Sequence, residues 1–257
     1  MSLPQISVQL YSLRDALKAD FEGTIRKLAA IGYPCVEPAG IHDRKPAEVA
    51  KLLADLNLTA PSAHCELPLG DAKNEIIETA LELGHRYLIT GIPPGGRDDY
   101  TSTDQVKAIA EQYCIAADNV AAHGLQVGYH NHDWDLSEFE THPAYHTFLA
   151  HTPESVLFEA DLFWIARAGI DPVGFLHVIG PRGKVLHFKD GHIADRSIEI
   201  PFLPAGQGEV DLIAAAQAAK DAEYIAVELD EYDGDMLNAV EQSYLYLTEN
   251  KIAGGKK

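Results

Sequence analysis

The sequence is poor in cysteine and in basic residues, and each shortage excludes a class of protein. It has only three cysteines, Cys35, Cys65 and Cys114, an odd number without a CxxC pair, so we expect reduced thiols in a cytosolic protein rather than a disulfide framework. Lysine and arginine total 20 against 39 aspartates and glutamates, for a formal net charge of −19. This charge repels nucleic-acid phosphates and anionic membranes, so we expect neither as a partner.

Several motifs that define large enzyme classes are also missing. No window approaches ~18 uninterrupted apolar residues and the first residues show no export signal, so we expect a cytoplasmic protein. Neither GxGxxG after the first predicted strand nor GxxxxGKS/T occurs, so a dinucleotide or P-loop site lacks its phosphate cradle. GxSxG and HExxH are absent too, which leaves serine-hydrolase and zincin chemistry without support.

What the sequence does contain is a regular alternation of short apolar runs and longer amphipathic segments. This pattern is typical of βα units and a parallel sheet. Eight units fit the 257 residues, and they predict an α/β fold, a single-domain (β/α)8 TIM barrel over residues 1–257, with an open doubly wound sheet as the alternative. We expect the tail that begins at Gly254 to fray. The predicted strands cover residues 6–12, 35–38, 60–64, 87–91, 126–132, 156–161, 185–190 and 224–230.

Ionisable side chains gather at the C-terminal ends of six predicted strands, where TIM barrels build their active sites. Side chains alternate between the faces of a strand, so residues two apart point the same way. Asp190 has the opposite parity to His187 and would join a site only through a bend. So many ionisable groups would repel one another unless a cation or substrate organised them. The pairs of matching parity are His130 with His132, Glu159 with Asp161, His187 with Lys189, and Glu228 with Asp230.

A divalent cation requires carboxylates and imidazoles that converge from different strands and leave a position open. Asp161, His187, Glu228 and one histidine of the fifth predicted strand can supply that set. Two other features stay open between function and packing. The segment Gly206-Gln-Gly-Glu-Val-Asp either binds an anion through its amides or is a turn and helix cap. Trp134 and Trp164 either stack on a sugar ring or fill the core.

The chain resembles the xylose-isomerase-like TIM-barrel superfamily, in its sugar phosphate isomerase/epimerase branch. That superfamily includes sugar isomerases and epimerases, inosose dehydratases and endonuclease IV. The net charge argues against the last of these. The resemblance spans the chain and rests on Val8-Gln-Leu-Tyr-Ser-Leu-Arg, Phe21-Glu-Gly-Thr, Ile31-Gly-Tyr, Val36-Glu-Pro-Ala-Gly, Ala60-Pro-Ser-Ala-His, Tyr129-His-Asn-His, Asp161-Leu-Phe-Trp and His187-Phe-Lys-Asp.

The resemblance implies one divalent metal, with manganese as first choice and zinc, magnesium, cobalt or iron as others. It assigns Asp161, His187 and Glu228 as ligands. The glutamate that the epimerases carry on strand 5 is missing, and we choose His132 as the fourth ligand. The absence of that glutamate also removes one half of the carboxylate pair through which epimerases exchange a proton.

The resulting hypothesis is an isomerase or epimerase that acts on a ketose or related sugar or polyol through a metal-stabilised ene-diolate. Glu228 or His130 would move the proton, with Glu37 and Lys189 as further catalytic residues. An alternative is a lyase acting on a keto-inositol or keto-glycoside, and another is a sugar-binding subunit without catalysis. The resemblance also allows a homo-oligomer. The expected substrate-binding residues are His64, Trp134, Trp164 and Asp190.

Overall fold

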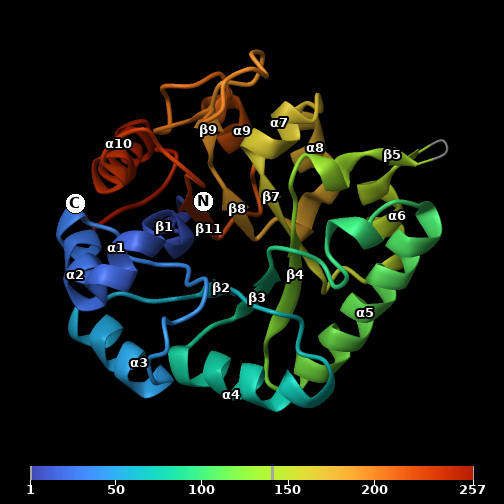
Figure 1. Ribbon diagram of the computed structural model, residues 1–257, viewed down its shortest axis with the longest axis horizontal. Coiled ribbons are helices and arrows are strands. Elements are labelled where there is room, and N and C mark those ends of the chain that lie inside the picture. The colour runs from blue at the N-terminus through green and yellow to red at the C-terminus, as the bar shows by residue number, and fades with distance from the viewer. Residues whose placement is uncertain (1, 140–141, 257) are drawn as a thin grey trace.

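Seven parallel strands form the centre of the molecule (Figure 1). The computed structural model describes residues 2–139 and 142–256. The strands pair in the order β1-β11-β8-β7-β4-β3-β2, so the first and last strands of the chain are neighbours, as closure of a barrel requires. Their bounds are β1 Gln5–Val8, β2 Ser62–His64, β3 Tyr87–Thr90, β4 Gln126–His130, β7 Leu157–Asp161, β8 Val185–His187 and β11 Tyr224–Val227.

The predicted strand at residues 35–38 closes the ring between β1 and β2. On one side the Glu37 amide donates to the Val8 carbonyl at 2.8 Å, and on the other the Val36 amide donates to the Thr59 carbonyl at 2.9 Å. The segment makes isolated bridges rather than a regular ladder, because Pro34 and Pro38 lack the N–H groups that a ladder needs. All eight strand positions are therefore occupied, and the predicted TIM barrel is confirmed.

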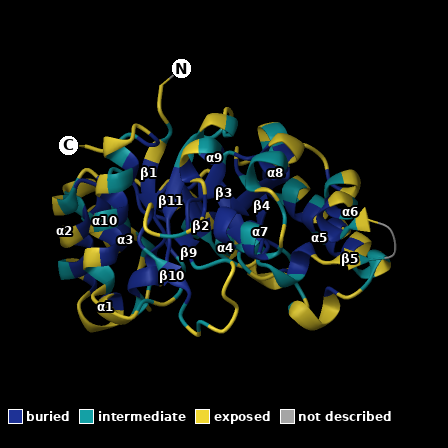
Figure 2. Cartoon of the chain, turned by 90° about the horizontal axis from the view of Figure 1, so that it is seen from above, coloured by how far each residue is buried: buried dark blue, intermediate teal, exposed yellow. Residues whose placement is uncertain are grey.

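Helices surround the strands, and the buried residues concentrate between the two layers (Figure 2). Aspartate side chains cap several helices; those of Asp171 and Asp211, for example, accept hydrogen bonds from backbone amides of the helices that follow them. Among the described residues, no helix is long and apolar enough to cross a membrane. The helices are α1 Arg14–Ala19, α2 Phe21–Ile31, α3 Pro46–Asp55, α4 Lys73–Leu83, α5 Thr103–Ala121, α6 Ala144–His151, α7 Leu162–Arg167, α8 Pro172–Ile179, α9 Leu212–Ala218 and α10 Met236–Glu249.

Two short antiparallel pairs lie outside the barrel, and the C-terminal segment docks onto it. The pairs are β5 (Glu138–Phe139) with β6 (His142–Pro143), and β9 (Asp190–Gly191) with β10 (Phe202–Leu203). The Gly254 amide donates to the Pro4 carbonyl at 2.8 Å, and the Lys256 amide donates to the Gly32 carbonyl at 2.9 Å. The tail was expected to fray, but Gly254 is hydrogen-bonded beside the start of β1 and Lys256 to the residue that follows α2; Lys257 lies outside the described residues.

Candidate functional site

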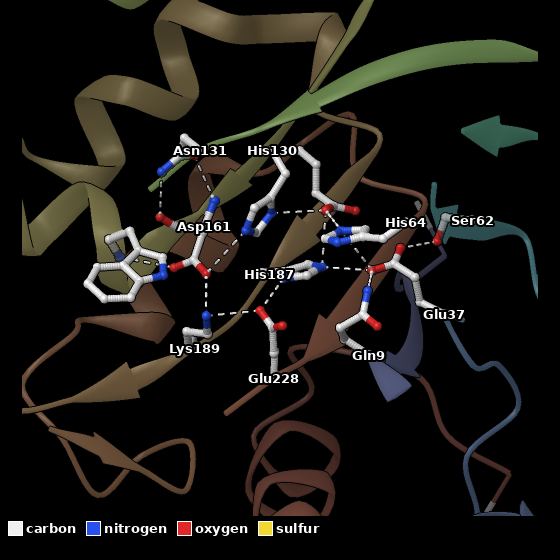
Figure 3. Close-up of polar contacts among 12 residues, drawn as sticks. Gln9, Glu37, Ser62, His64, His130, Asn131, Asp161, His187, Lys189 and Glu228 are labelled. Carbon is white, nitrogen blue, oxygen red and sulfur yellow. Dashed lines mark hydrogen bonds and ion pairs between the residues drawn. The ribbon is translucent and has the colours of Figure 1, made fainter. Parts of the chain in front are cut away.

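Four ionisable side chains converge at the C-terminal ends of neighbouring strands (Figure 3). His130 ends β4, Asp161 ends β7, His187 ends β8 and Glu228 directly follows β11. One ligand atom from each lies within 4.8 Å of the others, and all four residues are buried. A second group of this kind consists of His64, His130, Glu159 and His187.

Hydrogen bonds and ion pairs to carboxylates orient the two histidines. His187 directs Nδ1 to Glu228 Oε2 at 2.9 Å, while its Nε2 lies 2.8 Å from Glu37 and 3.1 Å from Glu159. His130 directs Nδ1 to Glu159 Oε2 at 3.0 Å, and its Nε2 lies 4.0 Å from Asp161 Oδ2. A carboxylate behind an imidazole ligand fixes its tautomer and orientation. Glu37 and Glu159 therefore lie behind the two histidines, with Asp161 and Glu228 in front.

Lys189 forms ion pairs with three carboxylates of the site. Its Nζ lies 3.0 Å from Asp161 Oδ2 and 2.9 Å from both Glu228 Oε2 and Asp230 Oδ2. Burial alone would lower the pKa of Lys189, but these three carboxylates raise it well above its usual range. The lysine is therefore a buried ammonium that compensates a cluster of negative charge.

The histidines and Glu159 form a second charged cluster. Burial acts to raise the pKa of Glu159, but the positive charges of His187 and His64 outweigh it and hold the pKa well below its usual range. Burial likewise acts to lower the pKa of His187, while Glu159 and Glu228 raise it well above the ordinary value. His130 behaves differently, because burial lowers its pKa well below that of a free imidazole. His130 is therefore neutral and has a lone pair to offer.

Glu37 lies deepest of the predicted catalytic residues. Its Oε1 accepts a hydrogen bond from Gln9 Nε2 at 2.8 Å, and its Oε2 accepts one from the Ser62 hydroxyl. Burial, followed by the charge of Glu159, raises its pKa. The side chain is fully buried and faces His187, so its contacts fit an orienting role better than direct contact with a substrate.

A cavity of about 370 Å³, which we call the inner cavity, opens above the four convergent groups. Among the predicted site residues, His64, His130, His132 and Glu228 line it. Asp161, His187, Lys189 and Glu37 are buried beneath these. The other lining residues are Tyr11, Arg14, Ala39, Gly91, Ile92, Asp230 and Glu231.

His132, chosen as the fourth ligand, belongs to neither convergent group, and His130 is present in both. β4 ends at His130, and the His132 amide donates to both carboxylate oxygens of Asp135, at 3.0 and 2.9 Å. The His132 ring stacks on Trp134 with centroids 5.8 Å apart. His132 thus lies in the wall of the inner cavity, next to His130 but outside the four convergent groups.

Neither predicted tryptophan lines the inner cavity. Trp134 lies behind His132. Trp164 lies beneath Lys189, whose Nζ is 5.5 Å from the ring centroid. Both indoles therefore pack against residues of the candidate site, as the packing alternative predicts.

Asp190, predicted to bind substrate, faces a backbone loop instead. Its carboxylate accepts hydrogen bonds from four amides, those of Gly191, Gly206, Gly208 and Val210, at 2.8 to 3.0 Å. The glycine-rich segment at 206–211 therefore does bind an anion through its amides, but that anion is Asp190. The opposite parity of Asp190 to His187 is consistent with this arrangement.

The sequence-based assignment missed Glu159 and the rim residues Tyr11, Arg14 and Glu231. For Glu159 a signal existed, because it lies two residues before Asp161 on the same strand and shares its face. Tyr11 and Arg14 follow β1 within the resemblance motif that begins at Val8. Glu231 carried no signal of its own.

The residues present fit a divalent cation. Asp161 uses Oδ1 to accept the Trp164 amide at 2.9 Å. Its buried Oδ2 accepts no hydrogen bond among the described residues, and the Lys189 ammonium lies 3.0 Å from it as an ion pair. Two imidazole nitrogens and two carboxylates from four strands make a donor set common for manganese, zinc or iron. A bound cation would give Asp161 Oδ2 a direct ligand bond in addition to its ion pair with Lys189.

Comparison with known proteins agrees with this architecture. A sugar phosphate isomerase/epimerase from Parabacteroides distasonis is 23% identical with a TM-score of 0.79, covering 98% of this chain and 100% of that one. The IOLI protein with a binding zinc atom is 14% identical with a TM-score of 0.74, covering 96% and 98%. The probable 3-DHS dehydratase AsbF of Bacillus anthracis is 16% identical with a TM-score of 0.73, covering 95% and 98%.

No curated protein matches this chain. The model of the xylose isomerase-like TIM barrel family, however, matches residues 25–248, which is most of the sequence. The chain therefore belongs to the xylose isomerase-like TIM barrel family.

Proposed function

We propose that this protein is a divalent-metal-dependent isomerase or epimerase of a ketose or related sugar. The observation that carries the proposal is the convergence of His130, Asp161, His187 and Glu228 beneath a cavity of sugar size. When bound there, a divalent cation supplies charge that polarises the ketose carbonyl and acidifies the neighbouring carbon-bound proton. Manganese is the first choice, with zinc, magnesium, cobalt or iron as alternatives.

The protein's own groups have separate tasks in this reaction. Of the two carboxylates among the four convergent groups, Glu228 is the one that lines the inner cavity. Glu228 therefore acts as the base that takes a proton from the substrate and returns it. His64 lines the same cavity with Nε2 held 2.6 Å from Glu159 Oε2, and it contacts a substrate hydroxyl. Lys189 pairs with both Asp161 and Glu228, and its charge outweighs burial at Glu228 and helps to hold the pKa of that carboxyl well below its usual range.

Metal content tests this proposal directly. We expect about one equivalent of metal in the wild type, because the four groups form one site. We expect none in Asp161→Asn or His187→Ala, each of which removes a donor. Plasma mass spectrometry of the folded proteins after incubation with manganese measures this, with His123→Ala as a control on an exposed histidine. Metal retained in both site variants, or absent from the wild type, contradicts the proposal.

Glu159→Gln is expected to weaken manganese binding by about 10–100-fold, because carboxylates behind ligand histidines have effects of this size. Glu159 contacts both His130 and His187 but is not one of the four convergent groups proposed to hold the metal. The control is Glu154→Gln, which alters an exposed carboxylate near the start of the same strand. Calorimetric titration of metal-free protein gives the affinities, and equal affinities for wild type and Glu159→Gln would remove Glu159 from this role.

A second candidate reaction is elimination of a group beta to the carbonyl, as in a lyase acting on a keto-inositol or keto-glycoside. The observation that favours it is His132, an imidazole on the cavity wall outside both convergent groups. An imidazole placed there can protonate a departing oxygen. Product analysis separates the two reactions, because elimination releases water or an aglycone and isomerisation yields only an isomer.

A further inference from the structure

A second, larger cavity adjoins the inner cavity. Its volume is about 550 Å³, and we call it the outer cavity. Arg14 and Glu231 line both cavities, so the two meet at these side chains. Each volume lies within the ~300–1,000 Å³ of typical ligand pockets. The inner cavity alone suffices for one sugar ring, which leaves the outer cavity without a use in the proposed reaction.

The outer cavity is lined by residues of α1, of α2 and of the segment that leads from β11 into α10. Figure 1 shows α1, α2 and α10 on the same side of the barrel. Its walls mix polar side chains, such as Asp15 and Lys27, with apolar ones, such as Leu13 and Ile200. Tyr232 adds an aromatic ring. A polyhydroxylated ring has hydroxyls at its edge and C–H groups on its faces, so it needs both kinds of contact.

Gly234 makes room for that aromatic ring. A Cβ at this position would lie 2.8 Å from Cε1 of Tyr232, closer than real contacts allow. The missing side chain therefore lets the tyrosine ring lie against the loop backbone, where it is half-buried and still lines the outer cavity.

Arg14 lies where the two cavities meet, and only part of its hydrogen-bonding capacity is used by the protein. Its Nη1 donates to the Tyr11 carbonyl at 3.1 Å and to the Asp230 carbonyl at 2.8 Å, which fixes the guanidinium. Among the described residues no carboxylate lies within 4.0 Å of Arg14, although the protein carries a net charge of −19. Its Nε and Nη2 protons have no partner among those residues either, so they are available to the oxygens of a ligand.

We propose that the substrate is a two-ring glycoside. Its ketose ring occupies the inner cavity, its second sugar ring occupies the outer cavity, and Arg14 binds oxygens near the linkage. The location of the ketose ring rests on the proposed function. The outer cavity contributes binding energy and selects linked sugars over single ones.

The test compares one ketose with disaccharides that contain it, using manganese-loaded protein and titration calorimetry. The probes are fructose and its glucosyl derivatives palatinose and turanose. We expect at least one disaccharide to bind about 10-fold or more tightly than fructose, a step of ~1.4 kcal/mol. Ala16→Trp inserts an indole into the outer cavity from the exposed side of α1. It should remove that advantage and leave fructose binding unchanged.

Ala19→Trp provides the matched control, because Ala19 is exposed on the same helix and lines neither cavity. The proposal is overturned if fructose binds as well as both disaccharides, if neither disaccharide binds, or if Ala16→Trp weakens all probes equally. Manganese binding with proton exchange into fructose but no disaccharide preference would sink this inference alone. A disaccharide preference without metal binding would instead remove the proposed function and leave the two-ring substrate standing.

Discussion

Glu228→Gln should lower the rate of proton exchange between solvent and a ketose substrate by about 10²–10⁴-fold, the usual contribution of a general base. Glutamine keeps the size of the side chain but cannot accept the proton. Among the four convergent groups, Glu228 is the only carboxylate that lines the inner cavity, so no other carboxylate of the four can replace it. Deuterium incorporation followed by proton NMR measures the rate.

Because Glu228 is also a proposed ligand, metal content must be measured on the same Glu228→Gln sample. Asp233→Asn is the matched control, since it removes an exposed carboxylate from the same loop without lining either cavity. Exchange that persists within about tenfold of wild type, with the metal retained, would transfer the role of the base to His130.

Lys189→Met is expected to destabilise the folded protein by about 3–5 kcal/mol, as removal of one partner of a buried ion pair does. The lysine is 1% exposed and contacts three carboxylates, and methionine removes the ammonium that pairs with all three. For a chain of this length the loss corresponds to a fall in melting temperature of about 10 °C. Urea denaturation with a chelator present measures the effect on the metal-free protein.

Lys184→Met is the control for that measurement. Lys184 lies 3.7 Å from Glu223 with its side chain 28% exposed, and a pair of this kind contributes about 0–1 kcal/mol. If the two lysine variants lose similar stability, then the carboxylates around Lys189 are compensated by another group, and the account of Lys189 as their main cation is wrong.

The position of the site was readable from the sequence because alternation along a strand is geometrically strict. It placed Asp161, His187 and Glu228 on inward faces, and the structure brings these three together with His130. The same rule failed to choose between His130 and His132. Alternation holds only while the strand lasts, and β4 ends at His130. Asp135 then holds the His132 amide and turns that residue toward the cavity wall.

Other features depend on contacts between distant segments, and local patterns do not encode these. The anion bound by the glycine-rich segment at 206–211 is Asp190 of β9, which precedes the amides it binds there by 16 to 20 residues. Arg14 reaches the Asp230 carbonyl across 216 positions of the chain. The outer cavity likewise requires Leu13, Ile200 and Tyr232 to meet. Contacts of this kind between distant residues can be read only from the tertiary structure.

The docking of the C-terminal segment along β1 has a practical consequence. Gly254 pairs with Pro4 and Ile6 at the start of β1, which is the end of the barrel opposite the strand ends that carry the site. A tag, surface linker or partner domain attached near either of these segments is therefore held away from the mouth of the barrel. The same proximity makes a circular permutant practicable, with new ends opened in an exposed loop and the active face left intact.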